Sequence, residues 1–194
     1  MKINTSTLKL IAISSSFFIA NTASAHTTSN SAGWLHPLSG LDHLLAMIAV
    51  GAWSSQIGGK AIWIVPTAFV CFMFIGGLLG FEHIELPASE VAVSLSVVLL
   101  GLAISVKKIL PLFIAAAATA LFGIFHGYAH GYEMPLIQNK ISYTLGFLTT
   151  TAILHIIGAV SAYFLLKSSA GDRFLRVLGT LSALCGLYLV AGVI

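Results

Sequence analysis

The pattern of hydrophobic positions along the chain divides it into six long apolar segments joined by short polar connectors. The segments are residues 37–54, 61–81, 88–106, 110–131, 141–166 and 174–194. Each is close to the ~20 residues that an α-helix needs to cross a bilayer. Trp34 and Trp53 flank the first segment, as expected of residues at the two membrane surfaces. The pattern therefore predicts an all-α, polytopic membrane protein, a bundle of six transmembrane helices.

Composition supports this class, because 58% of the residues are hydrophobic and only 8% are charged. A soluble domain has roughly a quarter charged residues. The net charge of +3 is small and the basic residues are scattered, so nothing indicates nucleic-acid binding. The expected surroundings are membrane lipid, and the sequence leaves open whether the chain forms a homo-oligomer.

The first residues have the features of a cleaved secretory signal peptide. Two lysines bracket the start of a short apolar stretch, and the small residues around Ala25 form a cleavage pattern. Cleavage there would make His26 the first residue, where an amine and an imidazole could chelate a metal, although a mobile polar tail is the favoured interpretation. We expect three parts: a signal peptide (1–25), an extracytoplasmic N-terminal segment (26–36) and a transmembrane domain (37–194).

The distribution of basic residues predicts the orientation. With the mature N-terminus outside, the inner connectors and helix ends carry six basic residues: Lys60, Lys107, Lys108, Lys167, Arg173 and Arg176. The outer side of the mature chain carries only Lys140. This bias agrees with the positive-inside rule. We therefore expect a multi-pass protein of the bacterial cytoplasmic (inner) membrane with its mature N-terminus outside.

Ionisable residues gather where the fourth apolar segment ends, in the run from Phe125 to Glu133. At about 100° per residue, His126, His130 and Glu133 share one narrow helical face. Ionisable groups within a membrane are costly and by default indicate function. Imidazole and carboxylate ligands without thiolate suit Ni²⁺, Co²⁺, Zn²⁺ or Cu²⁺. This face is a candidate metal site.

A second cluster opens the first apolar segment, with His36, Asp42 and His43. Pro37 should keep His36 extended, and Ser39 is the expected N-cap of the helix, with Asp42 in the third helical position as in a capping box. Asp42 could therefore be a simple cap. Its functional alternative is a metal ligand, or a carboxylate that orients an imidazole.

The two clusters should lie at the same depth, because the first segment starts outside and the fourth ends outside. We expect the two helices to meet through the small residues Gly123, Gly127 and Gly131, since such stripes allow close approach in lipid. Four imidazoles and two carboxylates would then form one site. The alternative is two unrelated sets of buried, hydrogen-bonded histidines.

Other ionisable residues could extend a path for a cation. Glu82, His83 and Glu85 fall in an outer connector, where they could collect cations or form a solvated turn. His155 lies in the fifth segment, as a relay ligand or as a histidine bonded to a backbone carbonyl. Glu90 lies in the first turn of a helix, where complementing the helix dipole is a sufficient role.

The two clusters resemble the motifs of the HupE/UreJ family of bacterial nickel and cobalt permeases. The family pattern His-x5-Asp-His matches His36, Asp42 and His43, and Phe-His-Gly-x-Ala-His-Gly-x-Glu matches residues 125–133 without a break. The resemblance covers nearly the whole chain. It implies uptake of Ni²⁺, with Co²⁺ as a further substrate, for hydrogenase or urease maturation proteins. It also implies that six residues are needed for transport: His36, Asp42, His43, His126, His130 and Glu133. The ion is cargo, and no permanently bound cofactor is expected.

Two other functions remain open on the residues alone. An intramembrane metal-dependent hydrolase could use His126 and His130, whose spacing is that of a His-Glu-x-x-His protease. Position 127 is glycine where that motif has its glutamate, and Glu133 or Asp42 could act as the base instead. A haem-binding electron carrier could use histidines from two helices. The chain has no Gly-x4-Gly-Lys-Ser/Thr loop, so facilitated diffusion or potential-driven entry is the simplest mechanism, without catalysis.

Overall fold

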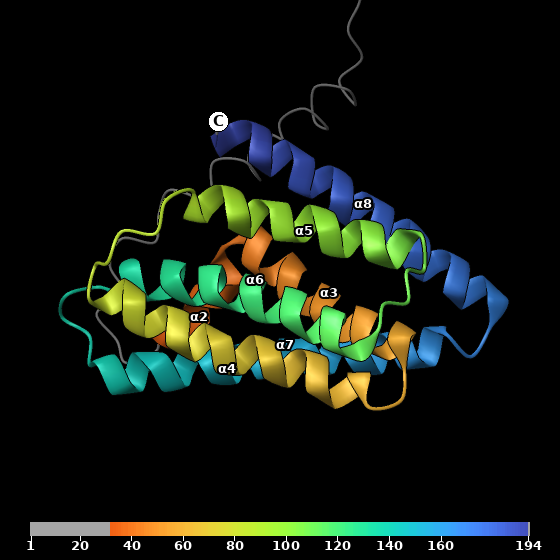
Figure 1. Ribbon diagram of the computed structural model, residues 1–194, viewed down its shortest axis with the longest axis horizontal. Coiled ribbons are helices and arrows are strands. Elements are labelled where there is room, and N and C mark those ends of the chain that lie inside the picture. The colour runs from red at the N-terminus through yellow and green to blue at the C-terminus, as the bar shows by residue number, and fades with distance from the viewer. Residues whose placement is uncertain (1–31, 194) are drawn as a thin grey trace, which may run out of the picture.

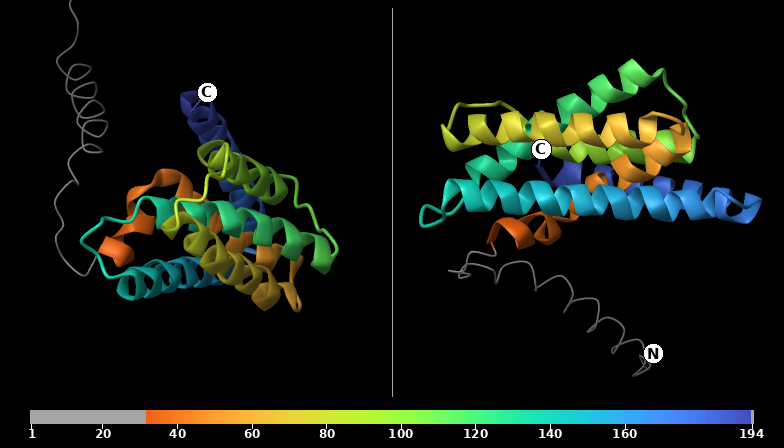
Figure 2. Two further views of the ribbon diagram at one scale, coloured as in Figure 1. Left: turned by 60° about the vertical axis from the view of Figure 1, so that its left-hand side comes forward. Right: turned by 90° about the horizontal axis from the view of Figure 1, so that it is seen from below.

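The computed structural model describes residues 32–193, which form seven α-helices and no strand. The helices are α2 (Ala32–Ser39), α3 (Leu41–Ile57), α4 (Ala61–Phe81), α5 (Ser89–Ser105), α6 (Leu112–Tyr132), α7 (Lys140–Leu165) and α8 (Ser169–Val193). The longer helices lie alongside one another (Figure 1), and short α2 lies at one end of the bundle (Figure 2). The predicted all-α fold is confirmed. The predicted signal peptide lies outside the described residues.

The last five predicted segments each coincide with one helix, from α4 to α8, and the first covers the end of α2 and most of α3. Within residues 32–193, α4, α6, α7 and α8 are long and apolar enough to cross a membrane, and α2 with α3 makes a fifth candidate if the bent pair is one span. Helix α5 is apolar but has only 17 residues. Large apolar side chains such as Trp63 and Phe113, each 74% exposed, cover the outside of the bundle, as suits a multi-pass membrane protein.

The start of the first predicted segment is broken rather than straight. Helices α2 and α3 meet at an angle of 92°. Gly40, in extended backbone, is the N-cap of α3, whereas the Ser39 hydroxyl donates to the carbonyl of His36, 2.7 Å away, so the predicted Ser39 cap is wrong. Pro37 lies within α2, and His36 is therefore helical and not extended. A proline disfavours but does not forbid a helical residue before it. Part of the expected extracytoplasmic segment is thus helix.

Glycines join the helices in three tightly packed pairs. These pairs are α4 with α6, α3 with α7 and α5 with α8. A Cβ atom added at Gly127 would collide with the carbonyl of Met73, and one at Gly51 would collide with the carbonyl of His155. Small residues thus let backbones touch, which supplies the packing that apolar side chains alone cannot supply in lipid. The glycine stripe of α6 faces α4, so the expectation that it meets the first span is wrong.

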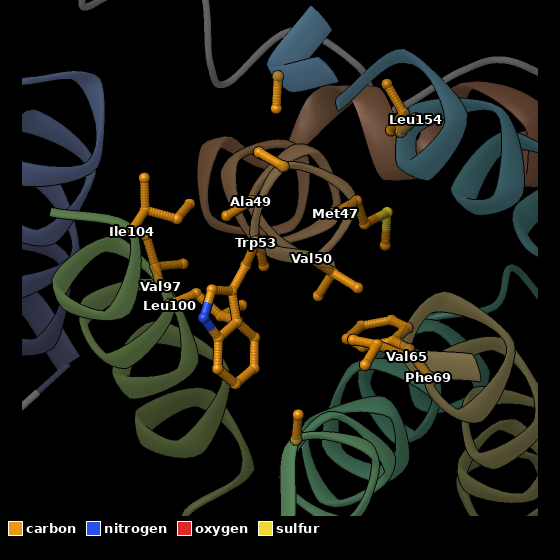
Figure 3. Packing of buried hydrophobic residues seen from close by; sticks show 14 of the residues in the cluster. Met47, Ala49, Val50, Trp53, Val65, Phe69, Val97, Leu100, Ile104 and Leu154 are labelled. Carbon is orange, nitrogen blue, oxygen red and sulfur yellow. The ribbon is translucent and has the colours of Figure 1, made fainter. Parts of the chain in front are cut away.

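Helix α3 lies at the centre of the apolar core. Trp53 packs with Val97 and Leu100 of α5 on one side, and Val65 and Phe69 of α4 lie on the other (Figure 3). Trp53 is only 2% exposed and its indole donates to the carbonyl of Lys108, 2.8 Å away. The predicted surface role of Trp53 is therefore wrong, whereas Trp34 is exposed.

The bundle has two chemically different ends. At one end, called the near end, α3, α5 and α7 begin and α4 and α6 finish. An ion pair of 3.4 Å there joins Lys140, at the start of α7, to Glu82, at the end of α4. The opposite end, called the far end, carries the six basic residues that the sequence predicts to lie inside: Lys60, Lys107, Lys108, Lys167, Arg173 and Arg176. One of them, Lys107, pairs with Asp172 at 2.9 Å.

Candidate functional site

Histidine rings from three helices pack together inside the near end. The ring centroid of His130 lies 4.8 Å from that of His36 and 4.6 Å from that of His43. His43 also lies 4.9 Å from His126. His126 and His130 are fully buried, and His43 is 8% exposed. The structure thus brings together the two clusters that the sequence separates by more than eighty residues.

The bend at Gly40 is what brings His36 to the site. In one straight helix, residues seven apart are separated by ~10.5 Å along the axis. Here the 92° angle between α2 and α3 lets His36 and His43 both contact His130. His36 Nε2 also lies 2.9 Å from Glu133 Oε2, at the C-cap of α6. Glu133 therefore joins the cluster through His36.

Asp42 orients His43 and fixes its tautomer. Asp42 Oδ1 lies 2.8 Å from His43 Nδ1, and it also accepts from the backbone N–H of His43 at 2.7 Å. A carboxylate only accepts, so Nδ1 carries the proton and Nε2 holds a lone pair. Nε2 is buried and has no partner among the described residues. This is the carboxylate–imidazole arrangement that commonly prepares a histidine for a metal ion.

Ser96 of α5 plays the same part for His126. Its hydroxyl lies 2.6 Å from the carbonyl of Val93, to which it donates, and 2.9 Å from His126 Nε2. The serine oxygen therefore accepts from Nε2–H, and Nδ1 of His126 is left with a lone pair. Nδ1 is buried without a partner in the described chain. Sequence reasoning missed Ser96, because a serine 30 positions from its histidine gives no local signal.

His130 lies between the other rings and is held by an aromatic neighbour. Phe147 of α7 stacks on it at 5.1 Å, and neither nitrogen of His130 has a partner in the described structure. Buried polar atoms without hydrogen bonds are rare and costly. As packed, ring against ring, no three histidine, cysteine or acidic side chains in residues 32–193 are arranged to hold one metal ion. Joint coordination requires these rings to rotate.

A cavity of about 160 Å³ reaches the cluster from the near end. Eight residues line it: Asp42, His43, Glu90, Val93, Ser94, Ala129, Glu133 and Val193. Three of these are acidic, so the cavity favours cations. Glu90 does lie in the first turn of α5, as predicted, but it also faces this cavity, which helix-dipole reasoning did not anticipate.

The remaining candidates lie outside the cluster. Glu82 pairs with Lys140, and the ring of His83 lies 5.1 Å from that of Tyr132, at the exposed surface of the near end. His155 is buried in α7, deeper than the cluster. His26 lies outside the described residues. Gly127 faces the backbone of α4, so a glutamate at this position, as a His-Glu-x-x-His hydrolase needs, has no space.

Comparison with known proteins agrees with the motif evidence. The model of the family described as "HupE / UreJ protein" matches residues 10–189. A curated relative, "Protein HupE" of Rhizobium leguminosarum bv. viciae, is 46% identical over 167 residues, which cover 86% of this chain and 87% of the relative. No solved structure matches significantly. The chain therefore belongs to the HupE/UreJ family, whose members are accessory and transport proteins linked to the nickel handling of hydrogenase and urease.

Proposed function

We propose that this protein is a permease that carries Ni²⁺, with Co²⁺ as a further substrate, into the cytoplasm through the buried histidine cluster. The observation that carries the proposal is the pair of oriented histidines. His43 and His126 each have one ring nitrogen held by a hydrogen bond and the other buried with a free lone pair. A neutral imidazole of this kind is a ligand for a divalent transition metal ion.

The proposed path begins at the acidic cavity of the near end, which faces outside. Asp42, Glu90 and Glu133 attract the hydrated cation, and the imidazoles then replace part of its water shell. His36, His43, His126 and His130 are the proposed imidazole ligands, with Asp42 and Glu133 as the carboxylates. Binding must be strong enough for entry and weak enough for release. In this proposal, rotation of the packed histidine rings switches the cluster between a state that binds the ion and a state that releases it.

The proposed topology has six spans, with α2 and α3 as one broken span and α5 as a short one, after a cleaved signal peptide. The six basic residues of the far end support a cytoplasmic location for that end. The membrane potential then drives entry, at ~2.3 kcal/mol per charge per 100 mV and about twice that for a divalent ion. The imported metal would serve hydrogenase or urease maturation.

The test is uptake of radiolabelled Ni²⁺ by a nickel-transport-deficient bacterium that produces the wild type or His130→Ala at matched membrane levels. We expect accumulation with the wild type and background uptake with the variant. A wild type that imports nothing would refute the permease. Gly127 leaves no space for a glutamate at the position where a His-Glu-x-x-His hydrolase has its base, and the hydrolase alternative would need Glu133 or Asp42 in that role. Turnover by metal-loaded protein without any metal flux would favour that alternative.

A further inference from the structure

One buried histidine is not used by the cluster at the near end. His155 of α7 is 2% exposed, and both of its ring nitrogens are buried without a partner among residues 32–193. It lies ~22 Å along α7 from the start of that helix at Lys140, in the interior of the bundle. The alternative predicted from sequence, a hydrogen bond to a backbone carbonyl, is therefore absent. A polar ring in such a place is costly unless it has a ligand.

One aromatic side chain, Phe69 of α4, contacts both His155 and the cluster. The ring centroid of Phe69 of α4 lies 5.3 Å from that of His126 and 5.0 Å from that of His155. Phe69 is fully buried. Both histidines therefore contact the same apolar ring.

Soft and polar atoms continue along the interface of α3 and α7 from the cluster towards His155. Met47 lies one turn after His43, and Thr151 lies one turn before His155. The Thr151 hydroxyl donates to the sulfur of Met47 at 3.1 Å, and both side chains are fully buried. A cation leaving His43 would therefore meet a thioether and a hydroxyl before it meets the next imidazole.

Beyond His155 lies a hollow in the outer surface of α4 and α7, where Trp63 and Tyr163 are exposed. A cavity of about 660 Å³ between α4 and α7 is lined by His155 and by residues near the far ends of both helices, such as Trp63 and Tyr163. Most of its lining is apolar, and it offers the hydroxyls of Ser55 and Thr67. Among the residues that line it, His155 is the one imidazole. Cys71 adds a thiol to the same lining, so His155 and Cys71 are the strong transition-metal ligands of this cavity.

We propose that His155 is an inner cation-binding station, which takes a divalent transition metal ion from the near-end histidine cluster. This inference rests on the proposed transport function and adds a second site to it. Two weak stations in series suit conduction better than a single tight site, because each ion can move on when the next arrives.

The test compares the wild type with His155→Gln and with the control Leu154→Met. Leu154 is the neighbouring buried residue of α7, and this swap conserves volume. Uptake of radiolabelled Ni²⁺ is measured in cells, and equilibrium dialysis with Ni²⁺ alone gives the number of ions bound per purified chain. We expect His155→Gln to bind one ion fewer than the wild type and to import at least about tenfold less, while Leu154→Met behaves as the wild type.

Equal stoichiometry in the wild type and His155→Gln would overturn the inner station, and so would unreduced import by this variant. If His155→Gln is unstable, His155→Asn provides the same comparison. If the wild type imports no nickel, the proposed function fails, but the stoichiometry still decides the inner station. Loss of import with loss of every bound ion would assign His155 a structural role and would also refute the inference.

Discussion

Replacing Gly127 by alanine tests whether backbone contact between α4 and α6 builds the site. Gly127 lies between His126 and the rest of the motif, and its α-carbon faces the backbone of Met73. An added Cβ would lie 2.7 Å from the carbonyl carbon and 2.8 Å from the Cα atom of Met73, against an ordinary contact of at least 3.4 Å. The carbonyl oxygen of Met73 would lie closer still, so the two helices must separate by more than ~0.7 Å. Overpacking of this kind costs roughly 1–3 kcal/mol of folding free energy.

The matched control is Gly192→Ala in α8, because a Cβ at Gly192 meets nothing within 4 Å. In a helix at an open position, alanine is favoured over glycine by about 0.5–1 kcal/mol. Thermal unfolding of the purified proteins in one detergent measures both. We expect a midpoint roughly 2–12 °C lower for Gly127→Ala and an unchanged or higher midpoint for Gly192→Ala. Equal midpoints for the wild type and Gly127→Ala would refute the close contact of α4 with α6.

Four further variants or conditions test the site itself. Glu133→Gln should cost no more than about 1 kcal/mol of stability, because its pair with His36 is half exposed, yet it should lower Ni²⁺ import at least about tenfold. The control Asp172→Asn breaks a far-end pair of equal length, 2.9 Å, and should leave import unchanged. Equal effects of the two variants on import would refute the assignment of Glu133 to the site. Asp42→Asn should weaken Ni²⁺ binding about 10–100-fold in dialysis, since the carboxylate no longer fixes the ring of His43; unchanged binding would contradict this. Ser96→Ala should raise the half-saturating Ni²⁺ concentration for import by freeing His126, and an unaltered value would rule out the positioning role. Import should fall as the external medium is acidified, because a protonated imidazole cannot bind a metal ion; import that persists unchanged at strongly acidic pH would argue against imidazole ligands.

The sequence predicted the helices well because lipid leaves so few alternatives. Long apolar segments with polar connectors can only be helices in a membrane, and five of the six coincide with one helix each. The shared face of His126 and His130 followed from helical periodicity within one segment. The common level with His43 followed from depth, since the first segment starts on the side where the fourth one ends. The contact itself was expected through the glycine stripe of α6, which instead faces α4.

The parts that were mispredicted depend on contacts between distant residues. Gly40 breaks the first segment, but Ser39 and Asp42 fit a capping pattern equally well, so local signals could not decide where α3 begins. A stripe of small residues shows that a helix packs closely, and it does not name the partner. Trp53 was assigned to the membrane surface by its position, whereas a carbonyl 55 residues away holds it in the core.

The most direct test of transport uses the purified protein alone in lipid vesicles. A nickel-sensitive dye inside the vesicles reports entry, and a potassium gradient with valinomycin makes the interior negative. We predict Ni²⁺ entry that rises with the size of the potential, and none in vesicles that contain His130→Ala. Tight binding of Ni²⁺ by the wild type without any entry would contradict the account, because the cluster would then store or sense the ion rather than conduct it.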